Sequence, residues 1–263
     1  MFHALASLPT PGGVCVLVNG DEERGSPTSR ELIEQAARRC VAAFVLEASA
    51  DEEGALKTAR KGTSRYEVVV HGRAAHAGLD PAKGVNATVE AAHQVLALAG
   101  LSAALSHDTS PLGAPTVTPT LVSAGSTVNT VPAPARVSVV VRVPTRAAQD
   151  RIDSLVRQLR VRTHGARLEV LGGARRPPME PESSAALFAL ASRLNSEAGY
   201  GPLRGRAVGG ASDGNYTASA GCPTLDGLGA VGGGAHADTE HVLVSHMAPR
   251  ARLLAGLIER SRS

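Results

Sequence analysis

The pattern that most constrains the fold is the order of apolar segments between residues 66 and 171. Apolar residues at Ile152, Leu155, Val156 and Leu159 repeat at the spacing of one helix face. The whole stretch has strand patterns at 66–70, 116–123, 137–143 and 168–171, and helix patterns at 86–99 and 148–161. The order strand–helix–strand–strand–helix–strand is that of the ferredoxin-like split unit. We therefore predict a separate βαββαβ domain at residues 60–174.

The flanking segments, residues 1–59 and 175–263, have a different pattern. We expect a short helix at 1–8, strands at 14–18 and 42–46, and helices at 29–40, 184–198 and 247–260. Strand, helix and strand at the spacing of the first segment indicate a βαβ unit of a parallel sheet. The sequence thus predicts one α/β domain, made of residues 1–59 and 175–263, that is interrupted by the βαββαβ domain.

Charge and composition exclude several classes of function. The 263 residues carry a formal charge of +3, but the basic residues are scattered and only 2% of residues are aromatic. A nucleic-acid binder more often has a basic stripe, so we expect no nucleic-acid partner. No apolar run reaches the ~20 residues that a membrane span requires, and the first residues do not resemble a secretory signal. The separated Cys15, Cys40 and Cys222 suggest reduced thiols and a cytoplasmic protein.

Acidic residues follow two of the predicted strands. Glu22 and Glu23 come after 14–18, and Glu47 comes after 42–46. Open α/β sheets place their sites at this edge. Taken alone, the acidic turn fits a solvated loop as well as a cation site, and Glu47 fits an ion pair as well as a ligand. His236, in the loop GGGAHAD, offers an imidazole ligand but also fits an ordinary loop histidine.

Five blocks in sequence order resemble one family. They are VLVNGDEERGSPTSRELIEQAA, VLEAS, VHGRAAHAGLDPAKGVNATVEAA, VSAGSTVNTVPAPARVSVVVR and GGASDGNYTASAGCPTLDGLGAVGGGAHADTEHV. The chain resembles, over nearly its whole length, the metal-dependent family of glutamate carboxypeptidase, acetylornithine deacetylase, succinyl-diaminopimelate desuccinylase and the aminoacylases. The resemblance implies an α/β, zinc-exopeptidase-like catalytic domain with an inserted ferredoxin-like lid that dimerises.

The resemblance also implies roles for single residues. In the family two zinc ions share a bridging aspartate and a water; cobalt or manganese are alternatives. By motif match, Glu22 in DEERGS would be the general base. Glu23 and His236 would bind one zinc, and Glu47 would bind the other.

The lid would contribute three further residues. His76 in GRAAHAG would reach the site of the partner subunit and stabilise the oxyanion. Asn129 and Arg142 would bind the substrate carboxylate, because a guanidinium can hold a carboxylate with two hydrogen bonds; without the resemblance, Arg142 would be a surface cation on a strand. The expected function is hydrolysis of an amide bond in an N-acyl amino acid or before a C-terminal glutamate-like residue. The expected partners are a small-molecule or peptide substrate with a free carboxylate and a second copy of the chain.

The sequence departs from the family in one respect. The family has a metal-binding His-x-Asp motif and a bridging Asp upstream of the DEE turn, whereas no Asp precedes Asp21 here. We therefore expect a fragment of a hydrolase, compromised by the missing ligands, with exposed apolar surface near residues 14–18 that favours aggregation. The alternative is a catalytically inactive dimerisation or binding protein derived from the family.

Overall fold

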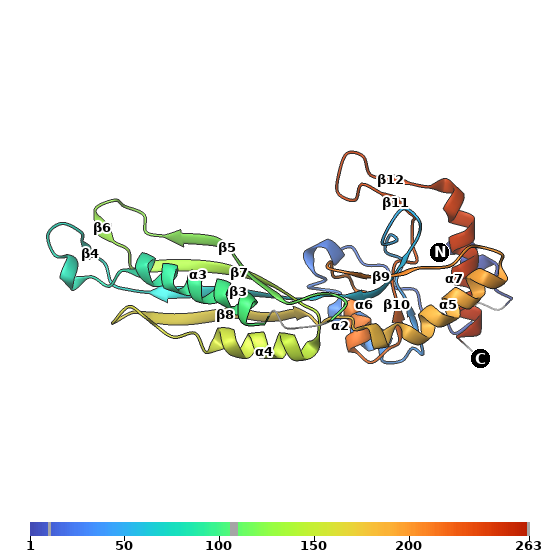
Figure 1. Cartoon of the computed structure of the whole chain (residues 1–263), viewed down its shortest axis with the longest axis horizontal. Helices are drawn as coiled ribbons and strands as arrows, with labels where there is room; N and C mark the ends of the chain where they lie inside the picture. The colour runs from blue at the N-terminus through green and yellow to red at the C-terminus, as the bar shows by residue number, and fades with distance from the viewer. Residues whose placement is uncertain (10–11, 106–109, 262–263) are drawn as a thin grey trace. The chain divides into compact units, whose positions relative to one another are not determined.

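The structure is a computed structural model that describes residues 1–9, 12–105 and 110–261 of the chain. Contacts between residues divide the chain into two compact units. Unit 1 consists of Met1–Lys61 and Arg176–Ser263, and unit 2 of Gly62–Arg175. Each unit has its own hydrophobic core. The elements of both units are labelled in Figure 1.

Unit 2 is a four-stranded sheet packed against two helices (Figure 1). The strands lie in the order β5-β7-β3-β8, and β7 pairs antiparallel with both β3 and β5. Their bounds are β3 Gly62–His71, β5 Thr116–Ala124, β7 Pro134–Val143 and β8 Arg167–Arg176, with helices α3 Ala87–Ala104 and α4 Arg146–Arg157. The predicted ferredoxin-like βαββαβ order is confirmed.

Alternation along β7 explains why this sheet has one buried face. Its buried residues are Ala135, Val137, Val139, Val141 and Val143, every second position of the strand. Successive side chains of a strand point to opposite faces, so these five all face α3 and α4. The helices begin where the sequence supplies a cap: the Asn86 side chain accepts from the Thr88 amide at 2.9 Å, and Thr145 Oγ1 accepts from the Ala148 amide at 3.1 Å.

A small tip extends unit 2 beyond the pair of His71 and Pro134. There β4 Ala75–His76 pairs antiparallel with β6 Thr130–Val131, and a 3-10 helix, η2 Pro81–Lys83, follows β4. Gly72 makes the close approach at this tip possible, because a Cβ atom there would lie 2.2 Å from the Val85 carbonyl oxygen.

Unit 1 contains short parallel strand pairs surrounded by helices. β1 Ala43–Phe44 pairs with β10 Thr224–Leu225, and β2 Leu56–Arg60 pairs with β9 Gly205–Val208. β11 Gly232–Gly233 and β12 His241–Val242 form an antiparallel pair. The helices are α1 Phe2–Ala6, α2 Arg30–Ala37, α5 Ala185–Glu197, α6 Gly214–Ser219 and α7 Met247–Arg260, with 3-10 turns η1 Glu22–Arg24, η3 Pro181–Ser183 and η4 Val244–His246.

The predicted strand at 14–18 is wrong. The segment has no regular secondary structure, and no backbone hydrogen bond pairs it with another part of the described chain. Val16 and Val18 are 47% and 82% exposed, which agrees with the expected exposed apolar surface at this segment. An apolar run becomes a strand only where a neighbouring strand completes its hydrogen bonds, and residues 1–9, 12–105 and 110–261 provide no such neighbour.

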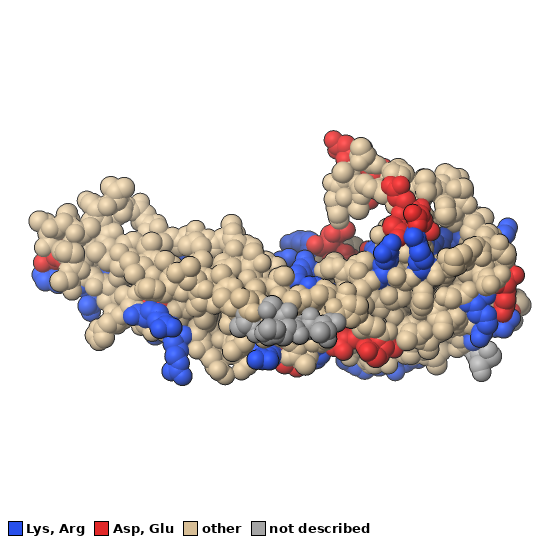
Figure 2. All heavy atoms as spheres, viewed as in Figure 1, with Lys and Arg blue, Asp and Glu red and all other residues tan. Residues whose placement is uncertain are grey.

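Charged side chains of both signs adjoin each other on the face drawn in Figure 2. Ion pairs at helix spacing, such as Arg30–Glu34 and Arg146–Asp150, also occur along the helices. Among the residues described, no helix is long and apolar enough to cross a membrane.

Candidate active site

The candidate site begins with the turn that carries Glu22. Asp21 organises this turn: its carboxylate accepts hydrogen bonds from Thr28 Oγ1 at 2.7 Å, the Thr28 amide at 2.8 Å and Ser29 Oγ at 2.5 Å. These hydrogen bonds, that of Ser29 first, hold the pKa of Asp21 well below its usual range. Gly25 (φ 91°) and Ser26 (φ 55°) both adopt left-handed backbone conformations, which closes the turn after η1.

Arg176 lies at the centre of the site and is almost completely buried. Its Nη2 atom is 2.8 Å from Glu22 Oε1 and 3.1 Å from Asp213 Oδ1. The same nitrogen lies 2.9 Å from the Glu22 carbonyl oxygen and 3.1 Å from Ser26 Oγ. One guanidinium therefore joins the acidic turn of the first segment to the start of α6, which are nearly two hundred residues apart in sequence.

Polar and aromatic neighbours fix this cluster in place. Asn19 Nδ2 donates to Asp213 Oδ2 at 2.8 Å, and Ser26 Oγ donates to Asp213 Oδ1. The buried Tyr216 lies under the Arg176 guanidinium, 5.4 Å from ring centroid to Cζ, and its hydroxyl donates to the Gly25 carbonyl at 3.0 Å. A cation over an aromatic face is attracted to it, so Tyr216 stabilises both the guanidinium and the turn.

Glu22 differs from its neighbour Asp21 in its proton affinity. Burial raises the pKa of Glu22, the Arg176 guanidinium opposes that rise, and the carboxylates of Glu47, Asp213 and Glu23 add to it. A carboxylate with a raised pKa is a better proton acceptor at neutral pH than an ordinary one. The arrangement can therefore take a proton from a water molecule or from another acid.

A second buried arginine lies near Glu47. Arg60, 3% exposed, holds the fully buried Asp226 through Nε–Oδ2 at 2.7 Å and Nη2–Oδ1 at 3.1 Å. Its Nη2 is also 3.8 Å from Glu47 Oε2, and Ser212 Oγ donates to Asp226 at 2.6 Å. Lys57 is close to this group. Burial is the main cause that lowers the pKa of Lys57, and the positive charge of Arg60 lowers it further.

The sequence-based prediction did not include three residues of these two groups: Arg176 in the first, and Arg60 and Asp226 in the second. Arg176 stands in the run RRPP, which predicts only the boundary between segments, and Asp226 in the run TLDGLG. The one available signal for Asp226 is a carboxylate directly after an apolar strand, the same pattern that singled out Glu47.

The expected metal ligands do not form a group of three side chains in the described residues. Glu23 and His236 are exposed, and His236 has a left-handed backbone, φ 62°, in the loop after β11. Throughout the part of the chain that is described, no three His, Cys, Asp or Glu side chains are grouped so that they could hold a metal. A catalytic zinc needs three protein ligands, so the described residues do not fit the metal centre that the resemblance implies.

In unit 2 the structure brings two of the expected residues together. Ala77, next to His76, donates its amide to the Asn129 carbonyl oxygen at 2.8 Å, and His76 pairs with Thr130 across β4 and β6. His76 Nδ1 accepts from the amides of Gly78 and Leu79, each at 3.1 Å, which fixes the ring orientation. Nε2 is thereby the ring nitrogen left to meet a ligand.

Arg142 lies elsewhere in unit 2. It pairs with Thr63 and Thr116 near the end of β7 that is opposite to Pro134. Arg142 is eight positions from Pro134 along β7, which is about 25 Å at the usual rise per residue of a strand. Within unit 2, Arg142 is therefore not part of the His76–Asn129 tip.

Comparison with known proteins identifies relatives of the chain and a family model that matches unit 2. A family model described as the peptidase dimerisation domain matches residues 58–165, which cover nearly all of unit 2. Carboxypeptidase G2 of Pseudomonas sp. (strain RS-16) is 31% identical over 256 residues, 94% of this chain and 59% of that protein. The chain thus spans less than two thirds of the length of this relative.

Solved structures agree on the fold. Aminopeptidase PepT of Bacillus cereus has a TM-score of 0.66 at 19% identity, covering 89% of this chain and 63% of its own. The YXEP protein of Bacillus subtilis, described as a dinuclear metal binding peptidase of the M20 family, has a TM-score of 0.62 at 16% identity and covers 90% and 61%. The sequence-based resemblance is confirmed: the chain is similar to a carboxypeptidase over most of its length, and unit 2 matches the peptidase dimerisation domain.

Proposed function

We propose that the protein hydrolyses an amide bond in an N-acyl amino acid or before a C-terminal glutamate-like residue. Its similarity to carboxypeptidase G2 over 94% of the chain supports this substrate class. The observation that carries the proposal is the half-buried carboxylate of Glu22, which lies 2.8 Å from Arg176 and whose pKa is raised by burial and by neighbouring carboxylates. Perturbed acids in a polar cluster are typical of catalytic sites.

Glu22 would act as the general base. Its Oε1 atom is buried and lies 2.8 Å from Arg176 Nη2. Arg176 would therefore fix the orientation of the carboxylate, while Oε2 accepts the proton of an attacking water. A base held in one orientation within hydrogen-bond reach contributes about 10²- to 10⁴-fold to such a rate.

Metal dependence belongs to the proposal, with zinc as the first candidate and cobalt or manganese as alternatives. When bound, such an ion polarises the amide carbonyl and acidifies water. Glu23, Glu47 and His236 remain the proposed ligands by motif. Because they form no three-ligand group in the described residues, no step of the mechanism is assigned to the ion.

Unit 2 would supply substrate contacts and a dimer interface. His76 and Asn129 share one tip, so they would contact the same part of a ligand. Arg142 would bind a carboxylate at the other end of β7. The match of residues 58–165 to a dimerisation domain supports a homodimer formed through this unit.

A panel of N-acetyl, N-benzoyl and N-succinyl amino acids and of peptides ending in glutamate tests the proposal. Each compound is incubated with the purified protein in the presence of zinc, cobalt or manganese, and release of the free amino acid is measured. Hydrolysis of at least one compound, suppressed by a chelator, supports the proposal. A folded, metal-supplied protein that cleaves none of them contradicts it.

The alternative function is a catalytically inactive dimerisation or binding protein. One observation favours it: Glu22 and Glu47 each already have an arginine partner, Arg176 and Arg60, and no three-ligand metal group is found in the described residues. Zinc content separates the two candidates, because about two ions per chain support the hydrolase and none supports the binding protein.

A further inference from the structure

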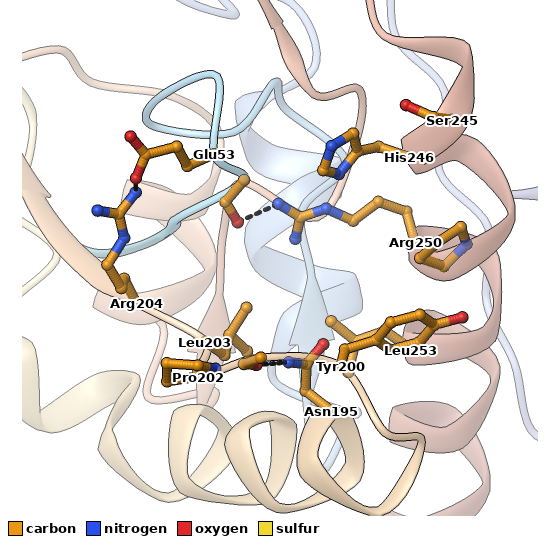
Figure 3. A pocket seen from close by; sticks show the side chains of 13 residues that line it. Glu53, Asn195, Tyr200, Pro202, Leu203, Arg204, Ser245, His246, Arg250 and Leu253 are labelled. Atoms are coloured by element: carbon orange, nitrogen blue, oxygen red, sulfur yellow. Dashed lines mark hydrogen bonds and ion pairs between the residues drawn. The ribbon is translucent and has the colours of Figure 1, made fainter.

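A pocket of about 310 Å³ lies in unit 1, at the start of α7 (Figure 3). Its walls come from the Glu53–Gly54 loop, from the segment between α5 and β9, and from the first turns of α7. None of the residues of the Glu22–Arg176 cluster lines it. Its volume is within the range of pockets that hold small molecules.

The pocket contains a cation, Arg250, for which the described part of the chain supplies no carboxylate at ion-pair distance. In Figure 3 the Arg250 side chain extends from α7 toward the Glu53–Gly54 loop, where its Nη2 atom donates to the Gly54 carbonyl oxygen. Its Nη1 atom is buried and has no hydrogen-bond partner among the described residues. Burial lowers the pKa of Arg250, although a guanidinium stays charged in proteins. A desolvated charge with unused donors is costly unless an acceptor reaches it.

The carboxylates nearby already have other partners. Glu53 forms an ion pair with Arg204, as Figure 3 shows. Asp51 lies 3.3 Å from Arg204 and 3.5 Å from Arg206, measured between carboxylate oxygen and guanidinium nitrogen. Two acids thus face two other arginines. Asp51 also attracts Arg250 electrostatically, but the described residues include no ion pair of Arg250 within contact distance.

The other walls define what else a ligand must carry. Leu203, Leu253 and Pro202 form an apolar side, and the Tyr200 ring lies beside them (Figure 3). The pocket also lies at the N-terminal end of the fourteen-residue helix α7, whose partial positive charge favours an anion. An anionic head beside Arg250 and an apolar tail against the leucines would satisfy both sides.

We propose that this pocket binds a small organic carboxylate with a short apolar tail. The carboxylate accepts from Arg250, which turns its Nη1 donor toward the ligand, and the tail covers Leu203 and Leu253. The site is separate from the Glu22 cluster, so binding here does not depend on hydrolysis at that cluster.

Calorimetric titration of the full chain with hexanoate tests the proposal, with hexanamide as the uncharged match and inorganic phosphate as an anion without a tail. We expect hexanoate to bind at least about tenfold more tightly than either, since a charged hydrogen bond and the apolar contact are both needed. Arg250→Gln should weaken hexanoate binding at least about tenfold. Arg193→Gln, on the exposed face of α5, is the matched control and should leave it unchanged.

A second variant keeps the test decisive if Arg250→Gln does not fold. A Cβ atom at Gly201, which lines the pocket, would meet no atom within 4 Å, so a side chain can start there without a clash. Gly201→Phe should therefore obstruct the pocket while Arg250 stays in place. We expect it to abolish hexanoate binding. Equal affinities for hexanoate and hexanamide, no binding of hexanoate by the unaltered chain, or full binding by a folded variant of either kind would each overturn the proposal.

Discussion

The Nη2 atom of Arg176 lies 2.8 Å from Glu22 Oε1 and 3.1 Å from Asp213 Oδ1, so that one buried nitrogen holds two carboxylates. Glu22 belongs to the 3-10 turn η1 in the first segment, and Asp213 precedes α6. The integrity of the candidate site therefore depends on a single guanidinium that contributes no metal ligand. Several consequences of this arrangement can be measured.

Replacing Arg176 by Met should destabilise unit 1. The change leaves Glu22 and Asp213 together without their shared counter-charge, and loss of one partner from a buried pair costs about 3–5 kcal/mol. Urea denaturation measures the free energy of unfolding. Arg193→Gln removes an exposed arginine that lies 3.8 Å from Glu197 and should cost less than about 1 kcal/mol. Equal losses for the two variants would show that the Arg176 cluster is not a stabilising centre.

Replacing Glu22 by Gln should change how stability depends on pH. Because the pKa of Glu22 is raised in the folded state, the folded protein binds more protons than the unfolded one between the ordinary value of 4.5 and the raised pKa. The contribution of Glu22 is thus most favourable below pH 4.5 and is lost as the pH rises through the raised pKa. Relative to the unaltered protein, Glu22→Gln should gain stability from pH 4 to pH 7 in urea denaturation. A relative loss over that interval would contradict the assigned direction.

The Arg60–Asp226 pair should be far more important for stability than a surface pair of the same type. Asp226→Asn weakens two hydrogen bonds in a fully buried place and should cost about 3 kcal/mol or more. Asp150→Asn removes the exposed partner of Arg146 on α4 and should change stability by no more than about 0.5 kcal/mol. Thermal unfolding of both variants gives the comparison. A small effect of Asp226→Asn would mean that water or a nearby group replaces the carboxylate.

Dimer formation through unit 2 should depend on the edge strand β5. Leu121 is 69% exposed there, and an edge strand with apolar side chains is a ready place for pairing with another chain. Leu121→Lys should shift the sedimentation coefficient from dimer toward monomer. Val41→Lys, at an equally exposed valine of unit 1, is the control and should sediment as the unaltered protein does. A dimer that tolerates Leu121→Lys would place the interface elsewhere.

Local patterns predicted much of the fold. The closing helix α7 has the predicted bounds, 247–260, because its apolar residues repeat at helical spacing and Leu253, Leu254, Leu257 and Ile258 are buried. The helices α3 and α4 likewise follow capping residues visible in the sequence. The prediction of a strand at residues 14–18 failed because an apolar run forms a strand only beside a second strand. Whether a second strand lies there is decided by the tertiary structure.

The candidate site was predictable only where a motif identified it. Glu22 and Glu47 stood out as carboxylates after apolar runs, but nothing local shows that each faces an arginine. Arg176 is 154 positions from Glu22, and Arg60 is 166 positions from Asp226. Such pairings depend on how distant segments of the chain fold together. The pairing of each carboxylate with an arginine was therefore visible only in the structure.

The most direct test of the account is the rate of amide hydrolysis by Glu22→Gln, compared with the unaltered protein on the best substrate of the panel. Glu31→Gln, an exposed acid on α2, serves as control, and circular dichroism verifies that each variant is folded. If Glu22 is the general base, kcat should fall by about 10²-fold or more in Glu22→Gln and stay unchanged in Glu31→Gln. A folded Glu22→Gln protein that retains the full rate would contradict the account.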